Sequence, residues 1–265
     1  MILDDLVAAT QKRLTREKAE LAPAALHEQA LAAPVPPAAA KLPVQLHQHF
    51  GIIAECKQAS PSKGQIAARF PVTQIASDYE AAGVDAISVL TEPDYFHGQL
   101  ADLKAVTQTV KTPVLRKDFT IDRYMIDQAR VSGATMVLLI AAILPSEQLR
   151  DLYEYTLKMG LLPLVECHSE AEINRALPLH PQLMGVNNRD LRDFSVDFQN
   201  SIRRRKLIPQ EIAVIAESGV TKPSQLQELQ VGGLNGALIG ETFMKAADRV
   251  ATIREYRRAV AGVQA

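Results

Sequence analysis

The sequence has little cysteine, no long apolar run and almost no net charge. Its two cysteines, Cys56 and Cys167, lie 111 positions apart within apolar runs, which predicts two reduced, buried thiols rather than a disulfide framework. The longest apolar run, residues 136–144, has nine residues, whereas a membrane-spanning helix needs about 20. A net charge of −1 and a pI near 6.6 give no general attraction to nucleic acid or to an anionic membrane.

Motifs for metals and nucleotide phosphates are missing as well. There is no G-x-x-x-x-G-K-[ST], no H-E-x-x-H and no paired-cysteine motif. His168 has no second ligand at metal spacing, so we interpret it as a helix-start or surface residue. The first residues carry Asp4 and Asp5 and no long apolar core, which is not typical of a secretory signal. These absences predict a cytoplasmic protein with no metal, no cofactor, no nucleic-acid or membrane partner and no obligate protein partner.

The first 50 residues differ from the rest of the chain. Apolar side chains recur there at near-helical spacing, at Leu3, Leu6, Val7 and Leu14, which predicts an amphipathic helix. The stretch 31–43 is rich in proline and alanine and is predicted to be an extended connector. We therefore expect residues 1–50 to form a helical arm packed on a main domain that spans 51–265.

From residue 51 onward, short apolar runs alternate with longer segments of helical period. The eight runs are 51–56, 85–90, 112–116, 135–140, 161–166, 183–187, 212–217 and 236–240. Runs that are apolar throughout are typical of a parallel sheet buried on both faces. Eight such units in about 215 residues predict an α/β fold, a (β/α)₈ TIM barrel with an N-terminal helical extension. The alternative, an open doubly wound sheet, usually has a Gly-rich turn after its first strand, and none follows 51–56.

Polar residues follow most of these runs, at the strand ends where barrel enzymes place their catalytic groups. In chain order they are Glu55 and Lys57; Arg116, Lys117 and Asp118; Glu166; Asn187, Asn188 and Arg189; Glu217, Ser218 and Gly219; and Gly240 and Glu241. Carboxylates and ammonium groups that meet at one mouth shift each other's pKa and supply an acid and a base. The strand ends therefore predict acid–base chemistry by lysine and glutamate.

Strand alternation indicates which of these side chains share a face. Residues i and i+2 of a strand point the same way, so Glu55 and Lys57 pair, and Asn187 and Arg189 pair. By the same rule the two cysteines point outward, toward the helices.

A phosphate site is predicted from the last two strand ends. Loops after strands seven and eight of a barrel, with the N-terminus of a short helix, often bind phosphate. Ser218 and Gly219 follow strand seven, and Gly240 and Glu241 open the segment after strand eight. The segment SPSKG (60–64) adds Ser60, whereas its Lys63 is interpreted as a turn residue.

Seven segments together form a pattern that is specific in its order and spacing. They are IIAECKQASPSKG (52–64), ISVLTEPDYFHGQLADL (87–103), PVLRKDF (113–119), LLPLVECHSEAE (161–172), MGVNNRDL (184–191), AESGV (216–220) and ALIGETFM (237–244). With them, residues 51–245 resemble the indole-3-glycerol phosphate synthase family. The N-terminal arm is similar in position to the extra helix of that family.

The resemblance implies a reaction and a set of roles. The reaction closes the indole ring of 1-(2-carboxyphenylamino)-1-deoxyribulose 5-phosphate, a phosphorylated small molecule, with loss of carbon dioxide and water. The implied catalytic residues are Lys117 as general acid, Glu166 as base, and Lys57, Glu55, Asn187 and Ser218. The implied substrate-binding residues are Phe96, Phe119 and Leu138 for the aromatic ring, Asn187 and Arg189 for its carboxylate, and Ser60, Ser218, Gly219, Gly240 and Glu241 for the phosphate. The resemblance does not assign the two lysines to particular steps.

Two alternatives remain at this point. The first is another phosphate-binding barrel enzyme of tryptophan biosynthesis, such as phosphoribosylanthranilate isomerase. Such an enzyme would use a cysteine–aspartate pair, and the outward direction of both cysteines disfavours it. A non-catalytic barrel that serves as a binding module is disfavoured by the intact charged residues at the strand ends.

Overall fold

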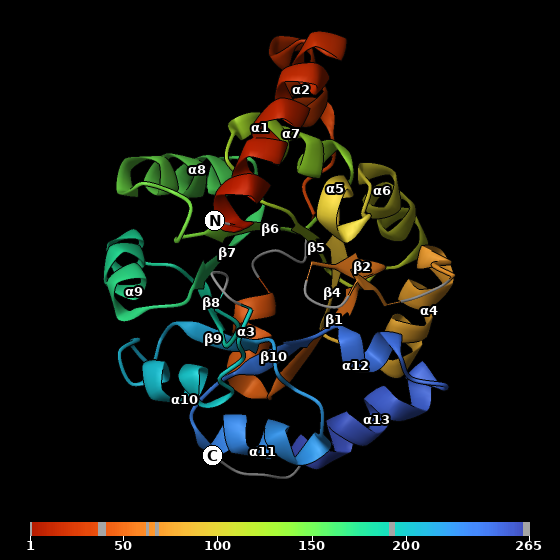
Figure 1. The fold of residues 1–265 in the computed structure, drawn as a ribbon, viewed down its shortest axis with the longest axis vertical. Helices are drawn as coiled ribbons and strands as arrows, with labels where there is room; N and C mark the ends of the chain where they lie inside the picture. Colours follow the sequence, from red (N-terminus) through yellow and green to blue (C-terminus); the bar gives the residue numbers. More distant parts are fainter. Residues whose placement is uncertain (1, 37–40, 62–63, 67–68, 191–193, 262–265) are drawn as a thin grey trace.

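A computed structural model describes residues 2–36, 41–61, 64–66, 69–190 and 194–261. Eight parallel strands close into a barrel in the order β1-β4-β5-β6-β7-β8-β9-β10 and back to β1 (Figure 1). Their bounds are β1 Gly51–Cys56, β4 Ala86–Leu90, β5 Val114–Lys117, β6 Met136–Ile140, β7 Leu162–Cys167, β8 Leu183–Asn187, β9 Ala213–Glu217 and β10 Gly236–Ile239. The predicted (β/α)₈ barrel is confirmed.

Helices form the outer ring. They are α4 Val72–Ala82, α6 Leu100–Thr109, α7 Arg123–Val131, α8 Ser146–Lys158, α9 Glu170–Ala176, α10 Gln199–Arg205, α11 Pro223–Val231 and α13 Arg249–Val260, with the short α5 Pro93–Phe96, η1 Leu177–Leu179 and α12 Glu241–Met244. Several begin at a side-chain cap, as α7 does at Asp122 and α9 at Ser169. A two-stranded hairpin, β2 Ala59–Ser60 with β3 Gly64–Gln65, lies in the loop after β1.

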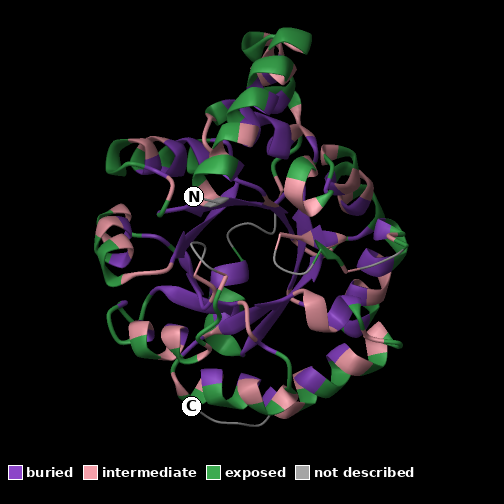
Figure 2. Ribbon diagram, viewed as in Figure 1, coloured by how far each residue is buried: buried purple, intermediate pink, exposed green. Residues whose placement is uncertain are grey.

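The strands separate two apolar layers, because successive side chains point to opposite faces of the sheet. The barrel interior is filled by residues such as Ile53, Leu138 and Ile215. The layer between strands and helices holds their neighbours, including Cys56 and Cys167, both buried and free. Figure 2 shows the same division, with buried strands inside and the exposed residues on the outer faces of the helices. The cysteines therefore face the helices, as the alternation predicts.

The described residues of the N-terminal arm, 2–36 and 41–50, form three helices, α1 Ile2–Glu20, α2 Pro23–Ala32 and α3 Leu42–Gln48. The first was predicted. The prediction of a connector over 31–43 was wrong in part, because α2 ends and α3 begins within that stretch. Pro23 and Pro43 lie in the first turns of α2 and α3, where a backbone N–H has no partner within the helix.

Helix α3 closes the barrel at the N-terminal ends of the strands. Leu42 and Leu46 are buried in the interior cluster, and a Cβ at Gly51 would collide with the Leu46 side chain. Asn235 Nδ2 donates to the Leu46 carbonyl at 3.2 Å. This end is sealed, so the opposite end is where a ligand can enter.

In the part of the chain that the structure describes, no helix is long and apolar enough to cross a membrane.

Candidate active site

A cavity of about 920 Å³ opens at the C-terminal ends of the strands. The structure places all fourteen predicted site residues on its wall, namely Glu55, Lys57, Ser60, Phe96, Lys117, Phe119, Leu138, Glu166, Asn187, Arg189, Ser218, Gly219, Gly240 and Glu241. They come from all eight barrel strands or from the segments that follow them, and the closed parallel topology brings those strand ends together.

Lys117, the last residue of β5, lies at the centre of the charged groups. Its Nζ is 3.1 Å from Glu166 Oε2 and 3.2 Å from Glu217 Oε2. Both carboxylates are buried, with side chains only 1 % and 2 % exposed. Burial alone would lower the pKa of Lys117, but Glu166, Glu217 and Glu55 outweigh it and raise that pKa. The lysine therefore carries a proton over the whole physiological range.

The two carboxyl groups beside Lys117 differ in charge. Burial raises the pKa of Glu217, and the neighbouring Glu166 carboxylate raises it further. Burial also opposes ionisation of Glu166, but Lys117 and His168 outweigh it and lower the Glu166 pKa. At neutral pH the pair therefore holds one proton, on Glu217, and one negative charge, on Glu166.

Glu217 is the central residue that the sequence analysis placed at a strand end but gave no role. The signal that could have found it is alternation along β9, since Ala213 and Ile215 face the interior and Glu217 continues that face. The structure makes room for it at Gly185 of β8, where a Cβ would collide with the Glu217 carboxyl.

His168 is the residue whose surroundings differ from the prediction. It does precede a helix, because Ser169 caps α9, but it is not at the surface, since its side chain is only 14 % exposed. Its Nε2 lies 3.4 Å from Glu166 Oε1 and its Nδ1 lies 3.3 Å from Glu172 Oε2. Burial would lower the His168 pKa, but its hydrogen bond to Glu172 and the charge of Glu166 raise it. His168 thus adds positive charge behind Glu166.

Glu55 and Lys57 form an ion pair at the end of β1, on the same side of the strand. Glu55 is buried, whereas Lys57 is partly exposed in the cavity. A Cβ at Gly240 would lie 2.7 Å from Glu55 Oε1. The glycine after β10 therefore leaves the space that the Glu55 carboxylate occupies.

Asn187, at the end of β8, connects Glu166 to the next loop. Its Nδ2 donates to Glu166 Oε1 at 3.2 Å, and its Oδ1 accepts from the Arg189 backbone at 3.0 Å. Arg189 Nη1 donates to the Phe194 carbonyl at 2.9 Å. The amide thus fixes both the Glu166 carboxylate and the start of the loop that carries the Arg189 guanidinium.

One wall of the cavity is apolar. Phe96 from α5 and Phe119 from the loop after β5 have ring centroids 6.2 Å apart, inclined at 45°. Leu138 from β6 is buried beside them in the interior cluster. Leu90, Ile140 and Leu238 also line the cavity, and a flat aromatic ring fits such a wall.

The opposite wall is formed by the loops after β9 and β10. Ser218 and Gly219 have φ angles of 68° and 88°, a left-handed backbone that turns the chain sharply. Thr242 Oγ1 donates to the Val220 carbonyl at 2.8 Å and so joins the two loops. Lys245, which the sequence analysis did not predict, lines the cavity here and pairs with Glu241 at 2.6 Å. Lys63, interpreted as a turn residue, lies outside the described residues.

These walls accommodate a ligand with a planar aromatic end and an anionic end. Among the described residues, no group of three or more His, Cys, Asp and Glu side chains is arranged to hold a metal ion. The deep charged cluster supplies an ammonium, a carboxylate and a carboxylic acid. These are the groups that general acid–base catalysis needs.

Comparison with known proteins gives matches over the whole barrel. The family model described as indole-3-glycerol phosphate synthase matches residues 3–256. Proteins of that name from Leuconostoc mesenteroides subsp. mesenteroides and Lacticaseibacillus casei are 48% and 45% identical to this chain, and each match covers 97% of this chain and 99% of the relative. One from Lactiplantibacillus plantarum is 44% identical over 99% of this chain and 100% of the relative.

Solved structures at low identity share the fold. A 3-hexulose-6-phosphate synthase from Salmonella typhimurium has a TM-score of 0.65 at 12% identity, with 80% of this chain and 98% of that chain covered. A thiamine phosphate pyrophosphorylase from Pyrococcus furiosus has a TM-score of 0.59 at 15% identity, with 82% and 97% covered. At such identities the likeness shows the barrel architecture alone.

Proposed function

We propose a division of the chemistry among the cavity residues, starting from the premise that this chain belongs to the indole-3-glycerol phosphate synthase family. Members of this family are carbon–carbon lyases (carboxy-lyases) of tryptophan biosynthesis. The reaction of this chain is ring closure of 1-(2-carboxyphenylamino)-1-deoxyribulose 5-phosphate to indole-3-glycerol phosphate, with loss of carbon dioxide and water. The observation that carries the proposal is the buried cluster of Lys117, Glu166 and Glu217 between an apolar wall and a phosphate-type loop pair.

Lys117 is the general acid in this proposal. When the aromatic carbon attacks the ketone, negative charge develops on the ketone oxygen, and a proton donor within reach lowers the barrier. The ammonium is held protonated by three carboxyl-bearing residues and lines the cavity beside the apolar wall. Lys57, with its partner Glu55, is the second cation and takes part in the dehydration step.

Glu166 is the base that removes a proton as the ring becomes aromatic. It is ionised, and Asn187 and Lys117 hold both of its oxygens. Glu217 keeps its proton at neutral pH, so only one of the two carboxyl groups beside the ammonium accepts a proton. Because the pKa of Glu166 is lowered and that of Glu217 is raised, we assign the role of base to Glu166 alone.

The substrate lies across the cavity from the apolar wall to the phosphate loops. Phe96, Phe119 and Leu138 contact the anthranilate ring, and Arg189 with Asn187 binds its carboxylate, for which a guanidinium is well shaped. Ser60, Ser218 and the backbone at Gly219, Gly240 and Glu241 bind the phosphate. Glu241 contributes only its backbone N–H, because its carboxylate would repel the anion.

The setting of the reaction is part of the same proposal. The protein acts in the cytoplasm on a small phosphorylated substrate, without nucleic acid, membrane, metal or cofactor. Residues 1–50 and 51–265 form an arm and a barrel of one domain, because α2 and α3 pack on α7 and on β9. An isomerase that uses a reactive cysteine is disfavoured because both thiols face the helices and burial raises the pKa of each.

A fluorescence assay for indole-3-glycerol phosphate tests the proposal. The purified chain receives the carboxyphenylamino-deoxyribulose phosphate, with chelator present and no added metal or cofactor. We expect product formation that a Lys117→Ala variant loses. A folded wild-type chain without turnover would refute the proposed function.

A further inference from the structure

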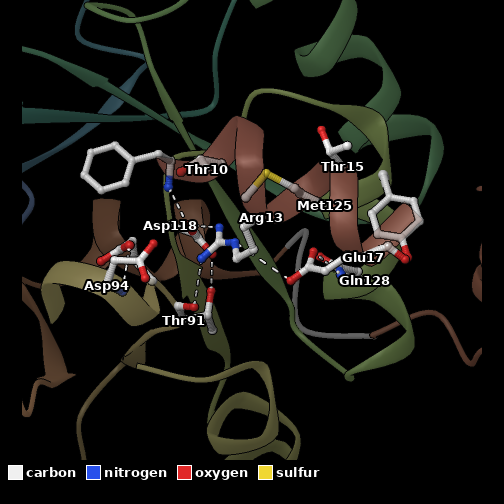
Figure 3. Close-up of polar contacts among 12 residues, drawn as sticks. Thr10, Arg13, Thr15, Glu17, Thr91, Asp94, Asp118, Met125 and Gln128 are labelled. Carbon is white, nitrogen blue, oxygen red and sulfur yellow. Dashed lines mark hydrogen bonds and ion pairs between the residues drawn. The ribbon is translucent and has the colours of Figure 1, made fainter. Parts of the chain in front are cut away.

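Arg13 of the N-terminal helix reaches the ends of two barrel strands (Figure 3). Its Nη2 donates to Asp118 Oδ1 at 2.8 Å, in the loop after β5. Its Nη1 donates to the Thr91 carbonyl at 3.3 Å, directly after β4. Its side chain is only 6 % exposed. One guanidinium thus joins α1 to two neighbouring strand ends 27 residues apart, at 91 and 118.

Asp118 is the centre of this network, and its side chain is fully buried. Its Oδ2 accepts from Thr91 Oγ1 at 2.6 Å and from Arg116 Nη2 at 3.1 Å. Its Oδ1 accepts from the Phe119 backbone N–H at 2.8 Å. Burial would raise the Asp118 pKa, but Arg116 and Arg13 lower it, so the carboxylate stays charged. A buried, fully hydrogen-bonded carboxylate has a single preferred position.

The residues on both sides of this network line the cavity. Asp118 stands between Lys117 and Phe119, which both line the cavity. Next to Thr91, the Glu92 carboxylate accepts the backbone N–H groups of Asp94, Tyr95 and Phe96 and so begins α5. The network therefore fixes the general acid and both aromatic rings of the ring-binding wall.

We propose that Arg13 is a positioning residue, which sets the place of Lys117 and of the Phe96–Phe119 wall by tying α1 to the ends of β4 and β5. This inference rests on the proposed function and extends it to a residue that touches no substrate. An error of about 1 Å in the position of reacting groups costs about 10²-fold in rate. A loosened Arg13 network therefore acts on catalysis as well as on stability.

Other contacts keep α1 docked without Arg13. Lys18 Nζ pairs with Asp122 Oδ2 at 2.6 Å, and the Tyr124 hydroxyl donates to the carbonyls of Glu17 and Leu21. Leu14 packs with Tyr124 in a small apolar cluster. Lys18 provides a matched control, because its ion pair also holds the helix but touches neither strand end.

The test measures kcat, KM and thermal unfolding for Arg13→Met, Arg13→Lys and Lys18→Met. We expect Arg13→Met to lower kcat roughly ten- to a hundredfold and to raise KM. Arg13→Lys is expected to restore kcat in part, because an ammonium reaches one acceptor and not both. Lys18→Met is expected to lower the unfolding temperature while kcat stays within about twofold of wild type, because its ion pair is half-exposed and such pairs contribute little beyond stability.

A double-mutant comparison separates positioning from stability. If Arg13 acts through Asp118, Arg13→Met combined with Asp118→Asn should lower kcat no further than Asp118→Asn alone. Wild-type kcat in Arg13→Met would overturn the proposal. It would also be overturned if Arg13→Met and Lys18→Met lost kcat only in proportion to their loss of unfolding temperature. If Arg13→Met does not fold, an Arg13→Lys variant with unchanged kcat and KM would overturn it. An inactive wild-type chain would instead refute the proposed function.

Discussion

Glu166 and Glu217 bind the same ammonium group, Lys117 Nζ, at 3.1 and 3.2 Å. One cation cannot neutralise two buried carboxylates, so one carboxyl keeps its proton. The asymmetry comes from the surroundings. Glu166 also accepts from Asn187 and faces His168, whereas Glu217 lies against Gly185, which offers no polar side chain. The barrel thereby holds one of two glutamates as a carboxylate and the other as a carboxylic acid.

Replacing Lys117 with alanine removes the proposed proton donor and the charge that keeps Glu166 ionised. We expect kcat to fall by roughly 10²-fold or more, a typical size for loss of general acid catalysis. Steady-state kinetics with the fluorescent product measure it. Lys104→Ala, an exposed lysine on α6, is the matched control and should leave kcat unchanged. A near wild-type rate for Lys117→Ala would remove the lysine from the mechanism.

Glu166→Gln keeps the shape of the side chain but cannot accept a proton. The amide retains one oxygen for Asn187 or Lys117, so substrate binding should change little, while kcat and kcat/KM fall together by roughly 10²- to 10⁴-fold. The control is Glu154→Gln on the exposed face of α8. An effect on KM alone would reassign Glu166 to binding.

The fold and most of the site follow from the sequence because strand ends and alternation are local signals. Glu55, Lys57, Asn187 and Arg189 reach one cavity because the barrel closes, and the eight apolar runs predict that closure. Two features depend on packing between distant segments and have no such signal. Closure of the barrel by α3 needs Asn235 to bind the Leu46 carbonyl, and the protonation of Glu217 needs Glu166 from another strand.

Arg116 and Asp118 illustrate the same limit within one motif. The sequence places them at a strand end on either side of Lys117. Strand alternation predicts that both side chains point to the face of the strand opposite to that of the lysine. It does not predict what covers that face. The structure shows Arg13 from a helix 105 positions away donating to Asp118, a contact that only the docked arm creates.

Glu217→Gln should weaken the pH dependence of stability. Burial and Glu166 raise the folded-state pKa of Glu217 from 4.5 to about 8. At pH values between these two, the folded chain therefore keeps a proton on Glu217 that the unfolded chain has already released. The contribution of Glu217 to stability is therefore complete below its unfolded pKa and is lost as pH rises through about 8. Glutamine cannot titrate, so this decline disappears.

Urea unfolding of wild type and Glu217→Gln at several pH values between about 5 and 9 measures the difference. The wild-type free energy of unfolding should fall with rising pH more steeply than that of the variant, by at most about 1.4 kcal/mol per pH unit for one proton. His168, whose raised pKa acts in the same direction, is present in both proteins, and Glu217 is the last and smallest of the causes that raise that pKa. Parallel curves would mean that Glu217 is ionised throughout.

Gly240→Ala tests the phosphate end, with inorganic phosphate as the readout that does not depend on the chemistry. The added Cβ would lie 2.7 Å from Glu55 Oε1, so the carboxylate or the loop after β10 must shift, and the backbone N–H groups there lose their approach to an anion. Loss of one charge-assisted hydrogen bond costs about 1.5–3 kcal/mol, so KM should rise roughly ten- to a hundredfold. The inhibition constant of inorganic phosphate, a competitive inhibitor, should rise by a similar factor, because phosphate probes the same loops without any reaction.

The control is Gly232→Ala, at the end of α11 and outside the cavity. It should change neither KM nor the inhibition constant of phosphate. If Gly240→Ala lowered kcat alone and left phosphate inhibition intact, its effect would come from displacement of Glu55, and the phosphate would have to be bound elsewhere.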